Sequence, residues 1–169
     1  MEPYRAATGD ARLRDDAAAP WYGVISDTHG LLRPEALAAL DGATAILHAG
    51  DVGGARVLDG LRELAPVYAV RGNNDLDPWG RTLPVTDVVD LGPGLVVLVH
   101  VIDDLDLDPV AAGVSVVVHG HSHAPSAVER GGVLTLNPGS AGPRRFRLPV
   151  TVARLRWEGA PVAEIVELL

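Results

Sequence analysis

Side chains able to bind metal ions stand directly after five separate apolar runs in this chain. They are two aspartates, one asparagine and four histidines: Asp27, His29, Asp51, Asn73, His100, His121 and His123. The chain contains no cysteine, so nitrogen and oxygen atoms must hold any metal. Seven donors suit two cations better than one. Two cations roughly 3.5 to 4 Å apart can acidify a water and stabilise an in-line displacement, which predicts hydrolysis of a phosphate ester.

The spacing of these donors supports a shared site. Asp27 and His29 are two residues apart, so both can face one side of an extended segment, and the same holds for His121 and His123. A carboxylate such as Asp51 has two oxygens and can bridge two cations. The mixed donor set favours Mn, Fe, Zn, Ni or Co over calcium, and we expect Mn.

Strands are needed to bring these donors together. Apolar runs predict strands near residues 21–26, 44–48 and 67–71, separated by helices near 34–40 and 54–65, which indicates parallel strands with crossovers. Further strands are expected near residues 85–91, 94–100, 114–118, 126–129, 133–137, 149–156 and 162–168, with one short helix near 109–112. So many strands predict two sheets packed face to face, with helices outside. The donors then lie at the carboxyl ends of strands, where α/β proteins bind ligands.

Composition limits the classes of protein and partner. Residues 1–20 show no apolar period and are expected to form a poorly ordered extension or an irregular arm, and residues 21–169 a single domain. No apolar stretch suggests a membrane span or signal peptide, so we expect a cytoplasmic protein. The net charge of -8 disfavours non-specific binding of nucleic-acid polymers. The absence of lysine excludes Schiff-base chemistry and a Walker-type lysine. A small phosphorylated substrate fits, and a homo-oligomer is compatible with the sequence.

Six motifs occur in one order: Ser-Asp27-Thr-His29-Gly, His-Ala-Gly-Asp51, Gly-Asn73-Asn-Asp, a strand-end His100, Gly-His121-Ser-His123 and Asn137-Pro-Gly-Ser140. Over about residues 22–142 this series resembles the calcineurin-like metallophosphoesterase superfamily, specifically its small bacterial and archaeal phosphodiesterases. The resemblance implies a four-layer αββα sandwich of two mixed sheets flanked by helices, and a hydroxide that bridges two metals. It implies a first metal held by Asp27, His29, His123 and Asp51, and a second held by Asn73, His100, His121 and the same Asp51.

The chain departs from the family pattern in two places. Many members have histidine where this chain has Asn74, and an amide cannot protonate a leaving group, although it can hydrogen-bond a phosphoryl oxygen. We therefore expect a preference for esters whose leaving group needs little protonation. The acidic stretch 103–108 replaces the glycine that often follows His100. It is expected to be a solvated loop that repels long polyanions.

Other residues have weaker assignments. Asp51, Asn74 and Asp75 are the candidate catalytic residues, although Asp75 could equally cap a turn. Asn74, Arg144 and Arg145 are candidates for binding the substrate phosphate, with an ordinary exposed loop as the alternative for the arginines. His48 and His119 are expected to pack or to hydrogen-bond rather than to bind metal.

Three functions compete. The first is a dinuclear metal-dependent phosphodiesterase, with activity on monoesters as a close variant. The second is a catalytically weak, metal-binding interaction scaffold, because a eukaryotic retromer subunit resembles the same fold. The third is a hydrolase with one metal and a substrate other than a phosphate ester. Retention of all seven donors favours the first.

Overall fold

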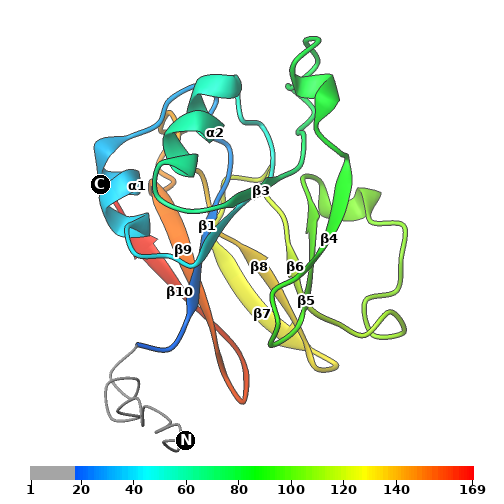
Figure 1. The fold of residues 1–169 in the computed structure, drawn as a ribbon. Coiled ribbons are helices and arrows are strands. Elements are labelled where there is room, and N and C mark those ends of the chain that lie inside the picture. Colours follow the sequence, from blue (N-terminus) through cyan, green and yellow to red (C-terminus); the bar gives the residue numbers. More distant parts are fainter. Residues whose placement is uncertain (1–17) are drawn as a thin grey trace, which may run out of the picture.

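Two five-stranded sheets pack face to face in the computed structural model, which describes residues 18–169. Both α-helices lie on the same side of the first sheet, away from the second sheet (Figure 1). This arrangement confirms the predicted α/β class with two mixed sheets. The expected extension 1–20 lies outside the described residues except for residues 18–20, which are exposed.

The first sheet has the strand order β10-β9-β1-β2-β3. Its three parallel strands are β1 (Trp21–Ile25), β2 (Ala45–His48) and β3 (Val67–Ala69). The crossovers contain α1 (Pro34–Leu40) and α2 (Ala55–Arg62), and proline at the start of α1 suits the first helical turn. Two antiparallel strands complete the sheet: β9 (Thr151–Glu158) and β10 (Ala160–Glu167).

The second sheet has the order β4-β5-β6-β8-β7. Its central strands are parallel: β5 (Leu95–Val99), β6 (Val114–Val118) and β8 (Val133–Asn137). The edges are antiparallel: β4 (Thr86–Asp90) and β7 (Ser126–Arg130). Two short 3-10 helices lie in connections: η2 (Gly80–Thr82) and η3 (Ile102–Asp104).

Side chains alternate along the strands and fill two main layers of core. Val24 and Leu47 of the first sheet pack against Leu98 and Val118 of the second. Ile25 belongs instead to the layer between the first sheet and the helices. These side chains are fully buried, and each such burial contributes about 2 kcal/mol of transfer free energy. The packed sheets therefore form a rigid base for the loops at the strand ends.

The layer outside the second sheet differs from the expected helical layer. Leu105 and Leu107, which follow η3, cover its valines, and no α-helix lies there within residues 18–169. The short helix predicted near 109–112 is wrong: a single turn, closed by Ala112 N donating to Asp108 O at 2.9 Å, occupies this segment. One turn cannot repay the cost of helix nucleation before Gly113 reverses the chain with φ of 71°.

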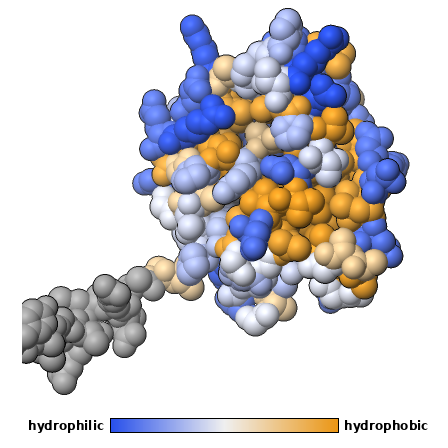
Figure 2. Space-filling model, turned by 45° about the vertical axis from the view of Figure 1, so that its right-hand side comes forward, coloured by the Kyte–Doolittle hydropathy of each residue, from blue (hydrophilic) through white to orange (hydrophobic). Residues whose placement is uncertain are grey.

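The side of the molecule that carries β4 and β5 presents many hydrophobic residues among hydrophilic ones at the surface (Figure 2). Val88 of β4 is half exposed, and Val85 just before β4 is exposed to a similar degree. Within the described residues, no helix is long and apolar enough to cross a membrane. The incomplete outer layer thus leaves apolar surface beside the loops that follow β3 and β5.

Candidate metal centre

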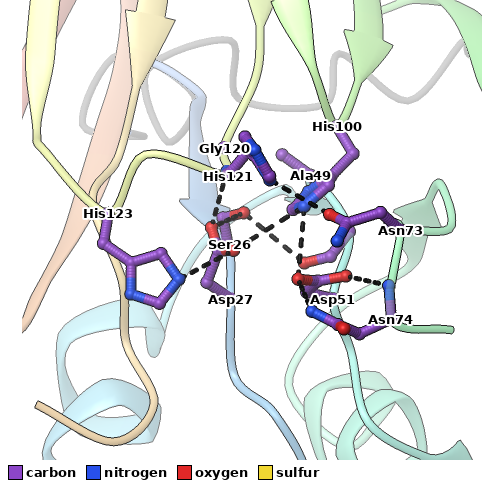
Figure 3. Close-up of polar contacts among 12 residues, drawn as sticks. Ser26, Asp27, Ala49, Asp51, Asn73, Asn74, His100, Gly120, His121 and His123 are labelled. Atoms are coloured by element: carbon purple, nitrogen blue, oxygen red, sulfur yellow. Dashed lines mark hydrogen bonds and ion pairs between the residues drawn. The ribbon is translucent and has the colours of Figure 1, made fainter. Parts of the chain in front are cut away.

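Loops at the carboxyl ends of parallel strands bring the predicted donors together from both sheets. Figure 3 labels all of them except His29. In the first sheet, β1 leads to Asp27 and His29, β2 to Asp51 and β3 to Asn73; in the second sheet, β5 leads to His100 and β6 to His121 and His123. Because these particular strands are parallel within each sheet, their ends meet at one edge. This arrangement explains how donors from five separate runs reach one cluster.

Asp27 lies at the centre of the cluster. Its Oδ1 atom is 3.2 Å from His123 Nε2, 3.9 Å from His29 Nε2 and 3.8 Å from His100 Nε2. The carboxylate is fully buried. Its other oxygen accepts hydrogen bonds from Ser26 Oγ at 2.6 Å and from the backbone N–H of His121 at 3.1 Å. One oxygen is therefore fixed by the protein, and the other faces three imidazoles.

Asp51 faces imidazoles from both predicted metal sites. Its Oδ2 atom is 3.3 Å from His100 Nε2 and 3.8 Å from His29 Nε2. Two groups of ligand atoms are close enough to hold an ion: Asp27 with His29 and His123, and Asp27 with Asp51 and His100. Asp27 is thus common to both groups, whereas the resemblance implied Asp51 as the shared carboxylate.

Asn73 and His121 lie at the exposed side of the cluster. Asn73 Oδ1 is 3.0 Å from His121 Nδ1, and the ring of His121 packs edge-on to that of His100 with centroids 5.3 Å apart. Both side chains are exposed, in contrast to the buried Asp27, Asp51, His100 and His123. The donor cluster therefore runs from a buried base to a solvent-facing rim.

Unpaired buried atoms show that the residues present fit a cation. Within residues 18–169, Asp27 Oδ1, His100 Nε2 and His123 Nδ1 are buried without a hydrogen-bond partner. Buried polar atoms are normally paired, because leaving them unpaired is costly. His100 Nδ1 donates to Ala49 O at 2.7 Å, which leaves the lone pair of Nε2 facing the carboxylates. Two of these unpaired atoms, Asp27 Oδ1 and His100 Nε2, lie 3.8 Å apart and could bind the same cation.

The pKa values of the buried pair favour charge in the absence of a metal. Burial acts to raise the pKa of Asp51, but contacts with His100 and Asn74 outweigh it and lower that pKa below its usual range. Burial acts to lower the pKa of His100, but Asp51 and Asp27 outweigh it and raise that pKa. A bound cation would take the place of the proton on His100, so metal binding releases a proton.

The backbone holds most of the donors in an uncommon conformation. Six non-glycine residues in the described part of the chain have positive φ: Asp27 (54°), His29 (47°), Asp51 (51°), His121 (70°), His123 (60°) and Phe146 (53°). Five of the six are predicted metal ligands. The left-handed region costs roughly 1 kcal/mol or more per residue, and such strain concentrates at functional sites. The sharp turns aim these side chains back into the cluster.

Asp75 has a different environment from the one expected for a catalytic residue. Its carboxylate accepts the backbone N–H groups of Val52 at 3.0 Å, Gly53 at 3.0 Å and Gly72 at 2.8 Å. It is buried and makes no hydrogen bond to the side chain of Asn74 within the described residues. Asp75 therefore ties the loop after β2 to the loop after β3.

Asn74 contacts Asp51 twice. Its backbone N–H donates to Asp51 Oδ1 at 2.9 Å, and its side-chain Nδ2 donates to Asp51 Oδ2 at 2.7 Å. Its side chain is exposed at the rim. Asn74 thus orients one donor and lies where a substrate would enter.

The two arginines that are candidates for binding the substrate phosphate have different surroundings. Arg144 donates to the backbone oxygen of Leu169 at 3.0 Å, so this contact occupies part of its guanidinium group. Arg145 lies close enough to the cluster to act on His123: burial lowers the pKa of His123, and the positive charge of Arg145 lowers it further, against the opposing effect of Asp27. The charge of Arg145 therefore acts on one of the predicted donors, whereas the side chain of Arg144 contacts Leu169.

Sequence reasoning gave no role to several supporting residues. Ser140 Oγ donates to the backbone oxygen of Asp27 at 3.0 Å. Asn137 Nδ2 donates to Gly120 O at 3.1 Å and to Ser122 Oγ at 2.9 Å, which fixes the loop that carries two histidines. In the sequence, the only indication of these roles was the Asn137-Pro-Gly-Ser140 motif, whose Asn137 and Ser140 side chains fix the loops by these hydrogen bonds.

His48 is buried and hydrogen-bonded, as expected for a histidine that does not bind metal. The backbone N–H of Gly50 donates to Nδ1 at 3.2 Å, so the proton of the neutral ring is on Nε2, 2.9 Å from Thr28 Oγ1. The Thr28 hydroxyl in turn donates to Val52 O at 2.8 Å. This chain joins the loops after β1 and β2.

His48 should make the metal-free protein acid-sensitive. Burial lowers its pKa from 6.5 to about 3, against the charge of Asp75. The unfolded chain takes up this proton below its ordinary pKa and the folded chain does not, so stability falls as pH drops from about 6.5 towards 3. This residue contributes a slope of up to about 1.4 kcal/mol per pH unit. Chemical denaturation between pH 6 and 4 should show a shallower slope for His48→Gln, and equal slopes would contradict the assignment.

Comparison with known proteins agrees with the fold and with the family that the sequence motifs resemble. Residues 22–160 match the family described as the calcineurin-like phosphoesterase superfamily domain. A probable metallophosphoesterase of Methanocaldococcus jannaschii is 35% identical over 160 residues, covering 86% of this chain and 80% of the relative.

Two solved structures share the fold. A novel archaeal phosphodiesterase has a TM-score of 0.70 and 23% identity, covering 86% of this chain and 99% of its own. Vps29 of Entamoeba histolytica, complexed with Zn²⁺, has a TM-score of 0.63 and 22% identity, covering 88% of this chain and 99% of its own. On the family match and the archaeal relative, this chain belongs to the calcineurin-like phosphoesterase superfamily.

Proposed function

We propose that this chain is a dinuclear metal-dependent phosphodiesterase that acts in the cytoplasm on a small phosphorylated substrate, with activity on monoesters as a secondary property. The observation that supports it best is the pair of donor groups that share Asp27, with His29 and His123 on one side and Asp51 and His100 on the other. In the proposal, Asn73 and His121 complete the second group. Manganese is the proposed metal, and zinc is an alternative because the similar Vps29 structure contains it.

Bound divalent cations would supply Lewis acids for the phosphoryl oxygens and acidify the attacking water. The protein's part is to hold the donors in place: Ser26 and the backbone of His121 orient Asp27, and Asn74 orients Asp51. The amide of Asn74 also lies at the rim, where it can donate to a phosphoryl oxygen. It cannot supply a proton to the leaving group, so good leaving groups should react fastest.

The test combines metal content with turnover. Chelated protein is reloaded with manganese, its metal content is measured by mass spectrometry, and rates are measured on aryl and alkyl phosphodiesters. We expect about two metals per chain and aryl diesters hydrolysed at least about 100-fold faster than alkyl diesters, because only aryl oxides leave readily without a proton.

Other outcomes would separate the competing functions. Two bound metals with no turnover on any ester would favour the interaction scaffold. One metal per chain with full activity would favour a mononuclear hydrolase.

A further inference from the structure

A pocket of about 290 Å³ opens beside the exposed side of the donor cluster. It shares Asn73 and His100 with the cluster and extends away from it towards Arg71 and Arg81. Leu76, Val85 and Val101 supply apolar walls, and Asp104 supplies a carboxylate. A substrate whose phosphoryl group is held by the donors would therefore place a neighbouring part of itself in this pocket.

The two arginines of this pocket are free to bind a ligand. Within residues 18–169, neither guanidinium group makes a hydrogen bond or an ion pair with another residue. Their backbones are fixed, since Arg71 N donates to Pro84 O at 2.9 Å and Arg81 N donates to Asp77 O at 3.1 Å. Some other arginines of the chain form ion pairs, such as Arg62 with Asp59 and Arg156 with Glu158. Two unpaired guanidinium groups on anchored segments form a potential anion-binding site.

The charges and the volume limit what the pocket can hold. Two arginines against Asp104 leave a net positive charge, in a protein whose overall net charge is -8. This local reversal of sign would attract an anion towards a surface that otherwise repels one. About 290 Å³ lies near the lower end of the range for small-molecule sites, which suits a small substituent.

We propose that the preferred substrate is a small phosphodiester that carries a second anionic group, and that Arg71 and Arg81 bind this group while the ester phosphorus lies at the metals. The inference rests on the proposed function and specifies its substrate class. Phosphate and carboxylate both suit a guanidinium fork, and phosphate should bind better because it offers three oxygens to two arginines.

Matched substrates test the kinetic consequence. Three p-nitrophenyl phosphodiesters share one leaving group and differ in the other arm: propyl, 3-phosphopropyl and 3-carboxypropyl. With manganese-loaded protein we expect kcat/KM to be about tenfold or more higher for the charged arms, mainly through a lower KM, with phosphate above carboxylate. The double substitution of Arg71→Gln and Arg81→Gln should abolish this preference, so that kcat/KM becomes similar for the three substrates.

Arg130→Gln is the control, because it removes one arginine charge from exposed strand β7, which does not line the pocket. The control should keep the preference. Equal kcat/KM on all three substrates for the wild-type protein, or an unchanged preference in the double variant, would overturn the proposal.

A binding measurement separates this proposal from the proposed function. Calorimetry with propane-1,3-bisphosphonate and propylphosphonate should show tighter binding of the bisphosphonate to the wild-type protein and to Arg130→Gln, but not to the double variant. No turnover of the propyl substrate would overturn the proposed function alone. Equal affinity of the wild-type protein for the two phosphonates would overturn the arginine site alone.

Discussion

Asp51→Asn is expected to lower kcat on an aryl phosphodiester by about 1000-fold, which corresponds to about 4 kcal/mol of transition-state stabilisation. The substitution keeps the size of the side chain and removes its charge. Asp51 belongs to the donor group with Asp27 and His100, and its Oδ2 atom also lies 3.8 Å from Nε2 of His29 in the other group, so loss of the negative charge removes a donor from one group and changes the electrostatics of the other. The kcat from steady-state kinetics and the metal content should both decrease, the latter to fewer than two metals per chain.

Asp59→Asn is the control for this variant. Asp59 is an exposed aspartate of α2 whose carboxylate pairs only with Arg62 within the described residues. The control should retain wild-type rates and metal content. Full activity of Asp51→Asn with two metals bound would remove Asp51 from the proposed centre.

Gly72→Ala is expected to lower activity by about 100-fold or more without unfolding the protein. A Cβ atom at this position would overlap the Oδ1 atom and the backbone nitrogen of Asp51, so the carboxylate must move. The backbone of Gly72 is outside the left-handed region, so alanine can adopt its backbone conformation without strain. The effect of the substitution therefore comes from the steric clash with Asp51. The loss should therefore appear as reduced metal content and reduced kcat.

Gly60→Ala provides the comparison. Its new Cβ would meet only the terminal methyl group of Leu32, 2.6 Å away, which a flexible side chain can withdraw. Alanine also suits the helix interior of α2 better than glycine. Circular dichroism should show both variants folded, and only Gly72→Ala should lose metal. Unaltered metal binding in Gly72→Ala would mean that the loop after β3 can shift away from Asp51.

The donors could be predicted because their positions depend on local sequence. Each follows a short apolar run, and the carboxyl ends of parallel strands meet at one edge, so the pattern alone predicts that Asp27, Asp51 and His100 lie together. Two mixed sheets follow from the number of strands.

Other features depend on tertiary contacts that no local pattern records. The role of Asp75 follows from three backbone N–H groups on two loops, and only Gly72 lies near it in sequence. Arg71 and Arg81 line one pocket although they are not adjacent in sequence, and their local sequence resembles an ordinary loop. The expected helix near 109–112 failed because four residues of apolar sequence do not distinguish a turn from a helix.

The strand order of the first sheet has a consequence for biosynthesis. Strand β1 lies between β2 and β9, so it remains an open edge until residues 151–158 leave the ribosome. Ser140, which supports the turn at Asp27, also precedes β9 by only a few residues. Strand β1 must therefore remain without its partner β9 until residues 151–158 have been synthesised. Such late closure of long-range pairs slows folding and makes the partly synthesised chain a target for chaperones.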